Sequence, residues 1–165
     1  MLTINGTAST IGYPLCMRRL LLLSVLSACS GGAGASGADL SGFPTARILV
    51  NGVEFEVYVA TTVGQQAQGL MFATEDQLLP LLDGTPRGML FVFSTEATRS
   101  FWMRDTYVPL DLAYARGDGV IAEVHELVPL DETPVVSGEP VQYALEALAG
   151  TFAAHGIVPG AVIEP

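Results

Sequence analysis

Short apolar runs, separated by glycine, proline and one Asn-Gly pair, constrain the fold of this chain most strongly. Between residues 47 and 60, apolar and polar residues alternate on both sides of Asn51-Gly52. Asn-Gly between two alternating runs is a strong signal for a β-hairpin with a tight turn. We expect further strands over residues 88–93, 100–103, 110–115, 120–128 and 141–148, and a closing strand near Val162.

Only short helices are expected between these strands. Thr62 is a suitable N-cap for a helix over residues 63–71. Residues 76–82, which Pro80 interrupts, and residues 151–155 are each expected to form about one helical turn. The whole pattern predicts a mainly β fold, a single small β-barrel or sandwich with about one to three short helices.

The first 42 residues differ in composition from the rest and are expected to direct export. Two successive arginines precede an apolar run that ends in Leu26-Ser27-Ala28-Cys29. A positive start, a short apolar run and a small residue before cysteine are typical of a bacterial lipoprotein signal. A helix that spans a membrane needs about 20 apolar residues, which is more than this run provides.

We therefore expect cleavage before Cys29 and acylation of its thiol, which makes the membrane a partner of the mature protein. In this interpretation Met17 is the true start and residues 1–16 are an over-extended reading frame; alternatively Met1 is the start and residues 1–16 extend the n-region, which preserves export. Residues 17–28 are then the signal peptide, because they combine the basic start, the apolar run and the small residues.

The residues after the cysteine favour a tethered domain at the outer membrane. Ser30 rather than Asp follows Cys29, and by resemblance to bacterial lipoproteins this favours the outer membrane, with the domain facing the periplasm. Residues 29–42 are rich in Gly, Ser and Ala, a composition typical of a flexible coil. Residues 43–165 then form one domain of ordinary size.

Charge and cysteine content exclude several classes of function. After Cys29 the chain has five arginines, no lysine and all seventeen acidic residues, so its formal net charge is about −12. Nucleic acid and anionic lipid headgroups are therefore not expected as partners, because both need clustered positive charge. Cys16 lies in the leader, so the domain has no free thiol for catalysis, redox chemistry or zinc. We expect no cofactor and no metal site.

Five motifs follow one another in the domain and carry a resemblance to a known family. They are Gly69-Leu70-Met71-Phe72, Gly88-Met89-Leu90-Phe91-Val92-Phe93, Phe101-Trp102-Met103, Pro109-Leu110-Asp111 and Tyr143-Ala144-Leu145-Glu146. In this order they closely resemble the family called domain of unknown function 192, over about residues 48–163. The resemblance implies a small, mostly β barrel. It implies no activity, because none is established for the family.

The chain departs from the usual pattern of that family at three places. It has Ala73 where the family usually has Arg, Arg104-Asp105 where a basic residue and Asn are usual, and Gly160-Ala161 where Gly-Asp is usual. If the usual Arg or Asp contacts a ligand, the resemblance implies that this contact is altered here.

Residues 101–111 hold the densest set of chemically functional side chains. Tryptophan and arginine are enriched at binding hot spots, and an indole face accepts a sugar ring or a cation. We predict a binding groove lined by Trp102, Arg104, Asp105 and Asp111. Its further walls are expected to include Met71, Met89, Met103 and Glu146. Alternatively, Trp102 fills the barrel core while Arg104, Asp105 and Asp111 form a structural network of ion pairs.

Two chemical alternatives remain open for the same residues. An enzyme acting on carbohydrate or cell-wall polymer requires Asp105, Asp111 or Glu146 to lie within about 10 Å of each other. The thioethers of the three methionines predict either a site for a soft metal such as Cu(I) or ordinary core packing. His125 and His155 lack metal-ligand spacing, and His125 is equally consistent with a solvated face.

The function that these features favour is binding rather than catalysis. We expect a lipid-anchored protein of the cell envelope, with a domain that acts as a non-enzymatic ligand-binding or accessory module. Its partner is then an unidentified small molecule or an envelope protein. A structural or protein-interaction module would instead show an exposed apolar patch without converging polar groups.

Overall fold

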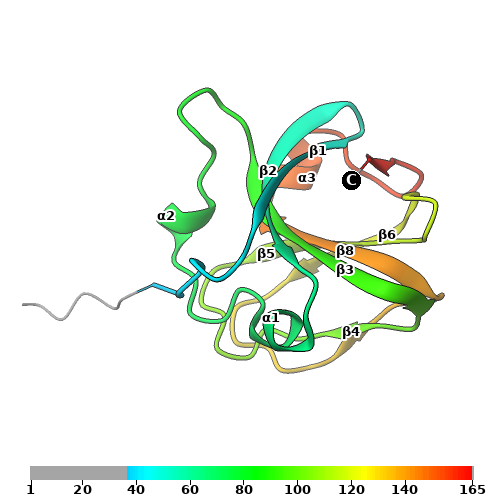
Figure 1. Ribbon diagram of the computed structural model, residues 1–165, viewed down its shortest axis with the longest axis horizontal. Coiled ribbons are helices and arrows are strands. Elements are labelled where there is room, and N and C mark those ends of the chain that lie inside the picture. Colours follow the sequence, from blue (N-terminus) through cyan, green and yellow to red (C-terminus); the bar gives the residue numbers. More distant parts are fainter. Residues whose placement is uncertain (1–36, 165) are drawn as a thin grey trace, which may run out of the picture. The chain divides into compact units, whose positions relative to one another are not determined.

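Nine strands and three short helices lie along residues 37–164, the part of the chain that this computed structural model describes (Figure 1). In chain order they are β1 (Thr45–Val50), β2 (Val53–Ala60), α1 (Val63–Gln68), α2 (Glu75–Leu78), β3 (Arg87–Ala97), β4 (Ser100–Phe101), β5 (Leu110–Ala115), β6 (Ile121–Leu127), β7 (Val135–Val136), β8 (Val141–Leu148), α3 (Thr151–Ala154) and β9 (Ile163–Glu164). Seven strands form one curled sheet in the order β6-β5-β8-β3-β2-β1-β9, and β4 pairs with β7. The sheet is a half-barrel, so the predicted mainly β class with short helices is confirmed.

The export features predicted from the sequence lie outside the described residues. These are the signal peptide, the acylated Cys29 and the tether up to residue 36. Among residues 37–164, no helix is long and apolar enough to cross a membrane.

The predicted hairpin is present at the expected turn. β1 and β2 pair antiparallel up to Val50 opposite Val53, which leaves Asn51 and Gly52 as the turn. Both have positive φ angles, 52° and 76°, as a mirror-image two-residue turn requires. The side chain of Asn51 also donates to the Gly156 carbonyl at 3.2 Å, which ties the turn to the C-terminal part of the domain.

The connection from β2 to β3 gives the fold its parallel strand pair. Residues 56–60 of β2 pair in parallel with residues 87–91 of β3, and the long crossover between them carries α1 and α2. A parallel pair needs such a crossover, whereas an antiparallel pair does not. β3 then pairs antiparallel with β8, and β8 with β5, which places both neighbours of β8 far from it in sequence.

The two edges of the half-barrel meet at one end. Val120, just before β6, forms an isolated bridge to Val162, just before β9. The Ile163 N–H donates to the Gly119 carbonyl at 2.8 Å. Gly119 has a φ angle of 82°, and a Cβ there would lie 2.3 Å from the Ile163 oxygen. Only glycine fits this closure without displacing the backbone.

Alternate residues of the strands supply two apolar cores on opposite faces of the sheet. In β8, Ala144 belongs to the first core, whereas Leu145 and Ala147 belong to the second. Such alternation follows from the period of two along a strand. Glu146 therefore shares its face of the sheet with Ala144 and the first core.

The helices are shorter than the sequence predicted. α1 begins with a capping box, in which Thr62 Oγ1 accepts from the Gln65 N–H at 3.2 Å and Gln65 Oε1 accepts from the Thr62 N–H at 3.1 Å. It ends at Gly69, with a φ angle of 50°, rather than at Met71. α2 stops before Leu79, because a residue that precedes proline disfavours the helical conformation.

Residues 38–42 belong to the packed domain rather than to the flexible tether that we predicted. Ala38 and Leu40 are buried in the first core. Gln77 Nε2 donates to the Ala38 carbonyl at 2.9 Å, and Gln68 Nε2 donates to the Asp39 carbonyl at 3.0 Å. The apolar residues of this segment find a core surface that composition alone does not reveal.

Candidate ligand-binding cleft

A cleft of about 460 Å³ opens between the end of α1, the middle of β3 and the segment that leads from β3 to Trp102. Glu146 of β8 and Thr106 complete its wall. This volume falls in the range of about 300–1,000 Å³ that is usual for small-molecule sites. The lining residues are Gln66, Ala67, Gln68, Gly69, Leu70, Met71, Phe91, Phe93, Thr98, Arg99, Ser100, Phe101, Trp102, Thr106 and Glu146.

Two glutamines of α1 line the cleft and are fixed by their amide nitrogens. Gln66 Nε2 donates to the Val92 carbonyl at 2.9 Å, and Gln68 Nε2 donates to the Asp39 carbonyl at 3.0 Å. None of the hydrogen bonds within residues 37–164 uses the Oε1 atom of either side chain. Both amides therefore offer an oxygen acceptor to a ligand.

Aromatic side chains form the apolar part of the lining. The rings of Phe91 and Phe101 meet edge to face with centroids 4.8 Å apart, and Phe101 packs in the same way on Tyr114 at 5.6 Å. Trp102 is 44% exposed, and the guanidinium of Arg104 lies 5.6 Å from its ring centroid. The half-exposed indole thus remains accessible to a molecule in the cleft.

Glu146 is the buried acid of the cleft. Its side chain emerges from β8 between Met89 of β3 and Leu112 of β5, both of which are fully buried. The residue is 4% exposed, and burial raises the pKa of its carboxyl group to about 8. No hydrogen bond or ion pair links this carboxyl group to any other residue that the structure describes. At neutral pH it is therefore largely protonated and able both to donate and to accept.

Arg99 is the cation of the cleft, and its guanidinium is held by the protein. It lies 3.9 Å from the ring centroid of Phe93, and its Nη2 donates to the Thr95 carbonyl. Its Nε is buried and has no hydrogen-bond partner within residues 37–164. Burial is the cause of the raised pKa of Glu146, and no ion pair joins Arg99 to Glu146 among the described residues.

Of the predicted groove residues, the structure brings Trp102, Met71 and Glu146 together in the cleft. Met89 and Met103 lie instead in the first core, where both are essentially inaccessible. The three methionines therefore do not line one common site. Two of them pack in the core, which was the alternative interpretation of these residues.

Arg104 and Asp105 do not line the cleft, although the sequence grouped them with Trp102. Asp105 has a positive φ angle of 53°, which turns the chain directly after Met103. Arg104 Nε lies 3.6 Å from Asp105 Oδ2, and both side chains are exposed. They form the ion pair of our alternative interpretation, whereas Trp102 does not fill the core.

Asp111 lies on the opposite face of the sheet from Glu146. In the register of β5 and β8, Asp111 is opposite Ala147 and Leu112 is opposite Glu146, so the two acidic side chains point away from each other. Asp111 is 7% exposed, and its Oδ2 accepts from the Phe152 N–H at 2.8 Å at the start of α3. Its position indicates a structural role, and of the three acids that the enzyme alternative requires in one cleft, only Glu146 lines this one.

The two histidines occupy separate places. His125 Nε2 lies 2.8 Å from Glu123 Oε2, and its ring packs against Tyr114 with centroids 5.9 Å apart. His155 packs against Phe55 at 6.0 Å. Within residues 37–164, no three or more His, Cys, Asp or Glu side chains gather in an arrangement that could hold a metal ion.

Several polar side chains that were not predicted from the sequence surround the predicted residues in the cleft. The missed side chains are Gln66, Gln68, Thr98, Arg99 and Ser100. They flank two of the family motifs, the one over residues 69–72 and the one starting at Phe101, and this proximity was the signal available. Their convergence depends on the crossover between β2 and β3, which the sequence did not reveal.

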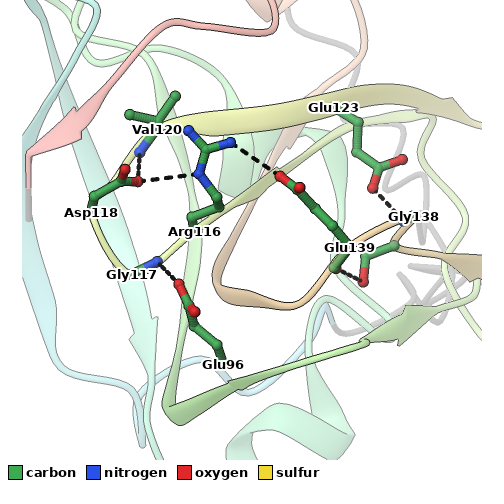
Figure 2. A network of polar contacts seen from close by, with 9 residues as sticks. Glu96, Arg116, Gly117, Asp118, Val120, Glu123, Gly138 and Glu139 are labelled. Atoms are coloured by element: carbon green, nitrogen blue, oxygen red, sulfur yellow. Dashed lines mark hydrogen bonds and ion pairs between the residues drawn. The ribbon is translucent and has the colours of Figure 1, made fainter.

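A second polar cluster, none of whose residues lines the cleft, joins the β5–β6 loop and the β7–β8 loop to β3 and β6 (Figure 2). Arg116 pairs with Glu139 at 3.1 Å and with Asp118 at 3.6 Å. Glu96 accepts from the Gly117 N–H, and Glu123 accepts from the Gly138 N–H at 2.6 Å. Exposed ion pairs of this kind contribute about 0–1 kcal/mol each. We assign the cluster a structural role, because its groups satisfy one another and the loop backbone.

Two solved structures are similar to this chain. A protein of unknown function from Novosphingobium aromaticivorans DSM 12444 is 33% identical, with a TM-score of 0.67, and the match covers 81% of this chain and 94% of that one. A "putative transcription regulator" from Sinorhizobium meliloti 1021 is 32% identical, with a TM-score of 0.65, and the match covers 74% and 94% of the two chains.

A curated protein is also similar to this chain, but the match covers less than half of that protein. The hemin import ATP-binding protein HmuV of Mesorhizobium japonicum is 27% identical over 124 residues, which are 73% of this chain. The chain spans only 46% of that protein.

The model of the DUF192 family, described as "Uncharacterized ACR", matches residues 46–165, nearly all of the folded domain. The chain therefore belongs to the DUF192 family.

Proposed function

We propose that the domain binds a small molecule in the cleft and does not transform it. The observation that carries this proposal is the carboxyl group of Glu146, which is buried in the cleft wall without a partner among the described residues. The fully buried side-chain atoms without a hydrogen-bond partner are Arg87 Nε and Arg99 Nε among the described residues, so the Glu146 carboxyl oxygens keep some exposure, which we assign to the cleft that Glu146 lines. A ligand in the cleft can therefore reach this carboxyl group and form the hydrogen bonds that no side chain of the described residues supplies.

Binding is favoured over hydrolysis because the cleft wall contains a single carboxyl group, that of Glu146. Glycosidases of the usual kind need two carboxyl groups on either side of the scissile bond. Asp111 of the neighbouring strand β5, which was a candidate for the second carboxyl group, points to the opposite face of the sheet from Glu146. A flat protein-interaction surface is also less favoured, because polar groups of several elements converge here.

The names of two similar proteins do not extend to this chain. ATP-binding loops of the Walker type require a lysine, and this sequence has none. DNA binding relies on clustered positive charge, whereas this chain carries a formal net charge of −10. A small-molecule ligand is consistent with both features.

We propose further that the mature protein is anchored through an acylated Cys29 in the cell envelope, at the outer membrane and facing the periplasm. The motif around Cys29 and the following Ser30 support this location. The test is membrane fractionation of cells that produce the wild type or Cys29→Ser. We expect the wild type in the membrane fraction and the variant released or unprocessed, and equal release of both proteins contradicts the anchor.

The binding proposal is tested by thermal shift of the full-length protein against sugars, amines, carboxylic acids, nucleosides and metal ions. A ligand at about one hundred times its dissociation constant adds about 2.7 kcal/mol to the free energy of unfolding. We expect at least one class of compound to stabilise the wild type and Tyr107→Ala, but not Trp102→Ala. Tyr107 is a matched control, since it is an exposed aromatic residue outside the cleft lining. Equal stabilisation of all three proteins places the ligand elsewhere and overturns the proposal.

A further inference from the structure

The wall of the cleft combines aromatic rings with uncharged hydrogen-bonding groups. Apart from Arg99 and Glu146, the polar part consists of amides and hydroxyls, namely those of Gln66, Gln68, Thr98, Ser100 and Thr106. The apolar part contains four aromatic residues, Phe91, Phe93, Phe101 and Trp102, together with Ala67, Leu70 and Met71. This lining suits a ligand with apolar faces and several uncharged polar groups at its edges.

We propose that the ligand of the cleft is a short neutral saccharide, an inference that rests on the proposed binding function. The C–H faces of a sugar ring pack against aromatic side chains, which supply a large apolar area with a defined orientation. Trp102, which is half exposed and lines the cleft, is the side chain best placed for this contact.

The hydrogen-bonding groups match hydroxyls, which donate and accept at the same oxygen. Gln66 and Gln68 use their amide nitrogens within the protein, so each presents its Oε1 as an acceptor. The hydroxyls of Thr98 and Ser100 can do either. A sugar with neighbouring hydroxyls satisfies such a mixed set, whereas a purely apolar ligand leaves it unpaired.

A cationic ligand fits this cleft less well. Glu146 is enclosed by the apolar side chains of Met89 and Leu112, and the pKa of its carboxyl group is raised. To form an ion pair with an ammonium group, the Glu146 carboxyl group would have to lose its proton in an apolar environment. This ionisation costs free energy. A protonated carboxyl group instead exchanges hydrogen bonds with a hydroxyl without any change of charge.

An anionic ligand is also disfavoured. The guanidinium of Arg99 stacks on Phe93 and its Nη2 donates to the Thr95 carbonyl, which leaves Nε as a single buried donor without a partner among the described residues, and a neutral hydroxyl oxygen can accept from it as an anion can. The surrounding chain carries a formal net charge of −10, so its field repels anions from the cleft.

The test uses the fluorescence of Trp102, which is the sole tryptophan of the chain and lines the cleft. The full-length protein in a detergent without sugar groups is titrated with N,N′-diacetylchitobiose, cellobiose and maltose. Choline and acetate serve as the charged probes. We expect a saturable change of emission with at least one saccharide and none with choline or acetate.

Two variants of Glu146 test whether the saccharide contacts the wall of the cleft. By calorimetry, Glu146→Gln should keep the saccharide affinity within about threefold, because its amide replaces a protonated carboxyl group, and Glu146→Ala should weaken it about tenfold or more. Glu132→Gln is the matched control, since Glu132 is exposed and outside the cleft. It should bind as the wild type does.

The possible failures separate the two proposals. If choline or acetate binds and no saccharide does, the saccharide assignment is overturned while the small-molecule function stands. If no probe changes the emission, the saccharide assignment also falls. If, in addition, no compound of the thermal-shift set stabilises the wild type more than Trp102→Ala, the proposed binding function is overturned as well.

Discussion

The carboxyl group of Glu146 imposes a cost on the fold that the rest of the sheet does not require. It lies on a strand face otherwise filled by apolar side chains, and burial raises its pKa from 4.5 to about 8. Folding therefore favours the protonated form, and ionisation of the folded protein is opposed. A difference of this size corresponds to roughly 5 kcal/mol once the pH is above both pKa values. Keeping such a group in a cleft wall is the behaviour expected of a binding site.

The pH dependence of stability follows from this shift. Between about pH 4.5 and about pH 8 the unfolded chain has lost the proton of Glu146 while the folded chain retains it, so the free energy of unfolding falls as the pH rises. Denaturant titrations at several pH values should show this decline in the wild type and in Glu132→Gln, but not in Glu146→Gln. A parallel decline in all three proteins would assign the effect to other groups.

The carboxylates with lowered pKa values do not affect this pH window. Hydrogen bonds from Ser41, Thr85 and Thr133 lower the pKa values of Asp39, Asp83 and Asp131, respectively. The stability that these groups add is therefore lost only when the pH falls below about 4. The decline at higher pH belongs to Glu146.

Asp111 has a role that can be separated from binding. Removing the acceptor of the Phe152 N–H in Asp111→Ala should reduce the free energy of unfolding by about 1–3 kcal/mol. Asp111→Asn retains an oxygen acceptor and should lose less. Chemical denaturation measures both, and a ligand that binds in the cleft should keep its affinity for the folded variants. Loss of affinity in Asp111→Asn with unchanged stability would contradict the structural assignment.

At the scale of elements, local signals were reliable and long-range pairing was not. Asn51-Gly52 predicts its hairpin and Thr62 predicts its helix, because each signal acts over a few neighbouring residues. The parallel pairing of β2 with β3 depends on the packing of a long crossover, which has no local signature. The same reason explains why β7, with only two residues, was missed.

The N-terminal segment of the domain gives a prediction at this scale. Ala38, Leu40 and Phe43 bury their side chains in the first core, so a chain that begins at Pro44 should be less stable than one that begins at Gly37. Burial of a leucine and a phenylalanine, less the entropy of ordering the segment, suggests a loss of about 2–4 kcal/mol. Urea denaturation of both chains measures it. Equal midpoints would mean that the segment contributes nothing.

Over the whole molecule, the candidate site was predicted only in part. Trp102, Met71 and Glu146 lie in three different family motifs and meet in the cleft. Arg104 and Asp105 were grouped with Trp102 by proximity in sequence, but the positive φ angle of Asp105 turns the chain away. Asp111 was misplaced because the alternation of β5 puts it on the other face. Side-chain direction follows from strand register, which sequence proximity does not reveal.

The charge of the whole chain predicts its behaviour toward nucleic acid. With a formal net charge of −10 and no lysine, the protein should not retard duplex DNA in a mobility-shift assay at about 0.1 M salt, where screening leaves a Debye length of about 10 Å. A salt-dependent shift of the DNA band would contradict the argument from charge. It would favour a role in DNA binding, as the name of the similar protein from Sinorhizobium meliloti suggests.

The central claim is that the ligand occupies the cleft, and NMR of methyl-labelled methionines tests it most directly. Met71 lines the cleft, whereas Met103 is buried outside the cleft lining and serves as an internal control. The compound that stabilises the protein most strongly in the thermal-shift set is titrated into the labelled protein. We predict a saturable shift of the Met71 methyl resonance with the Met103 resonance unchanged. A shift at Met103 alone, or no shift at Met71 at saturation, would contradict the account.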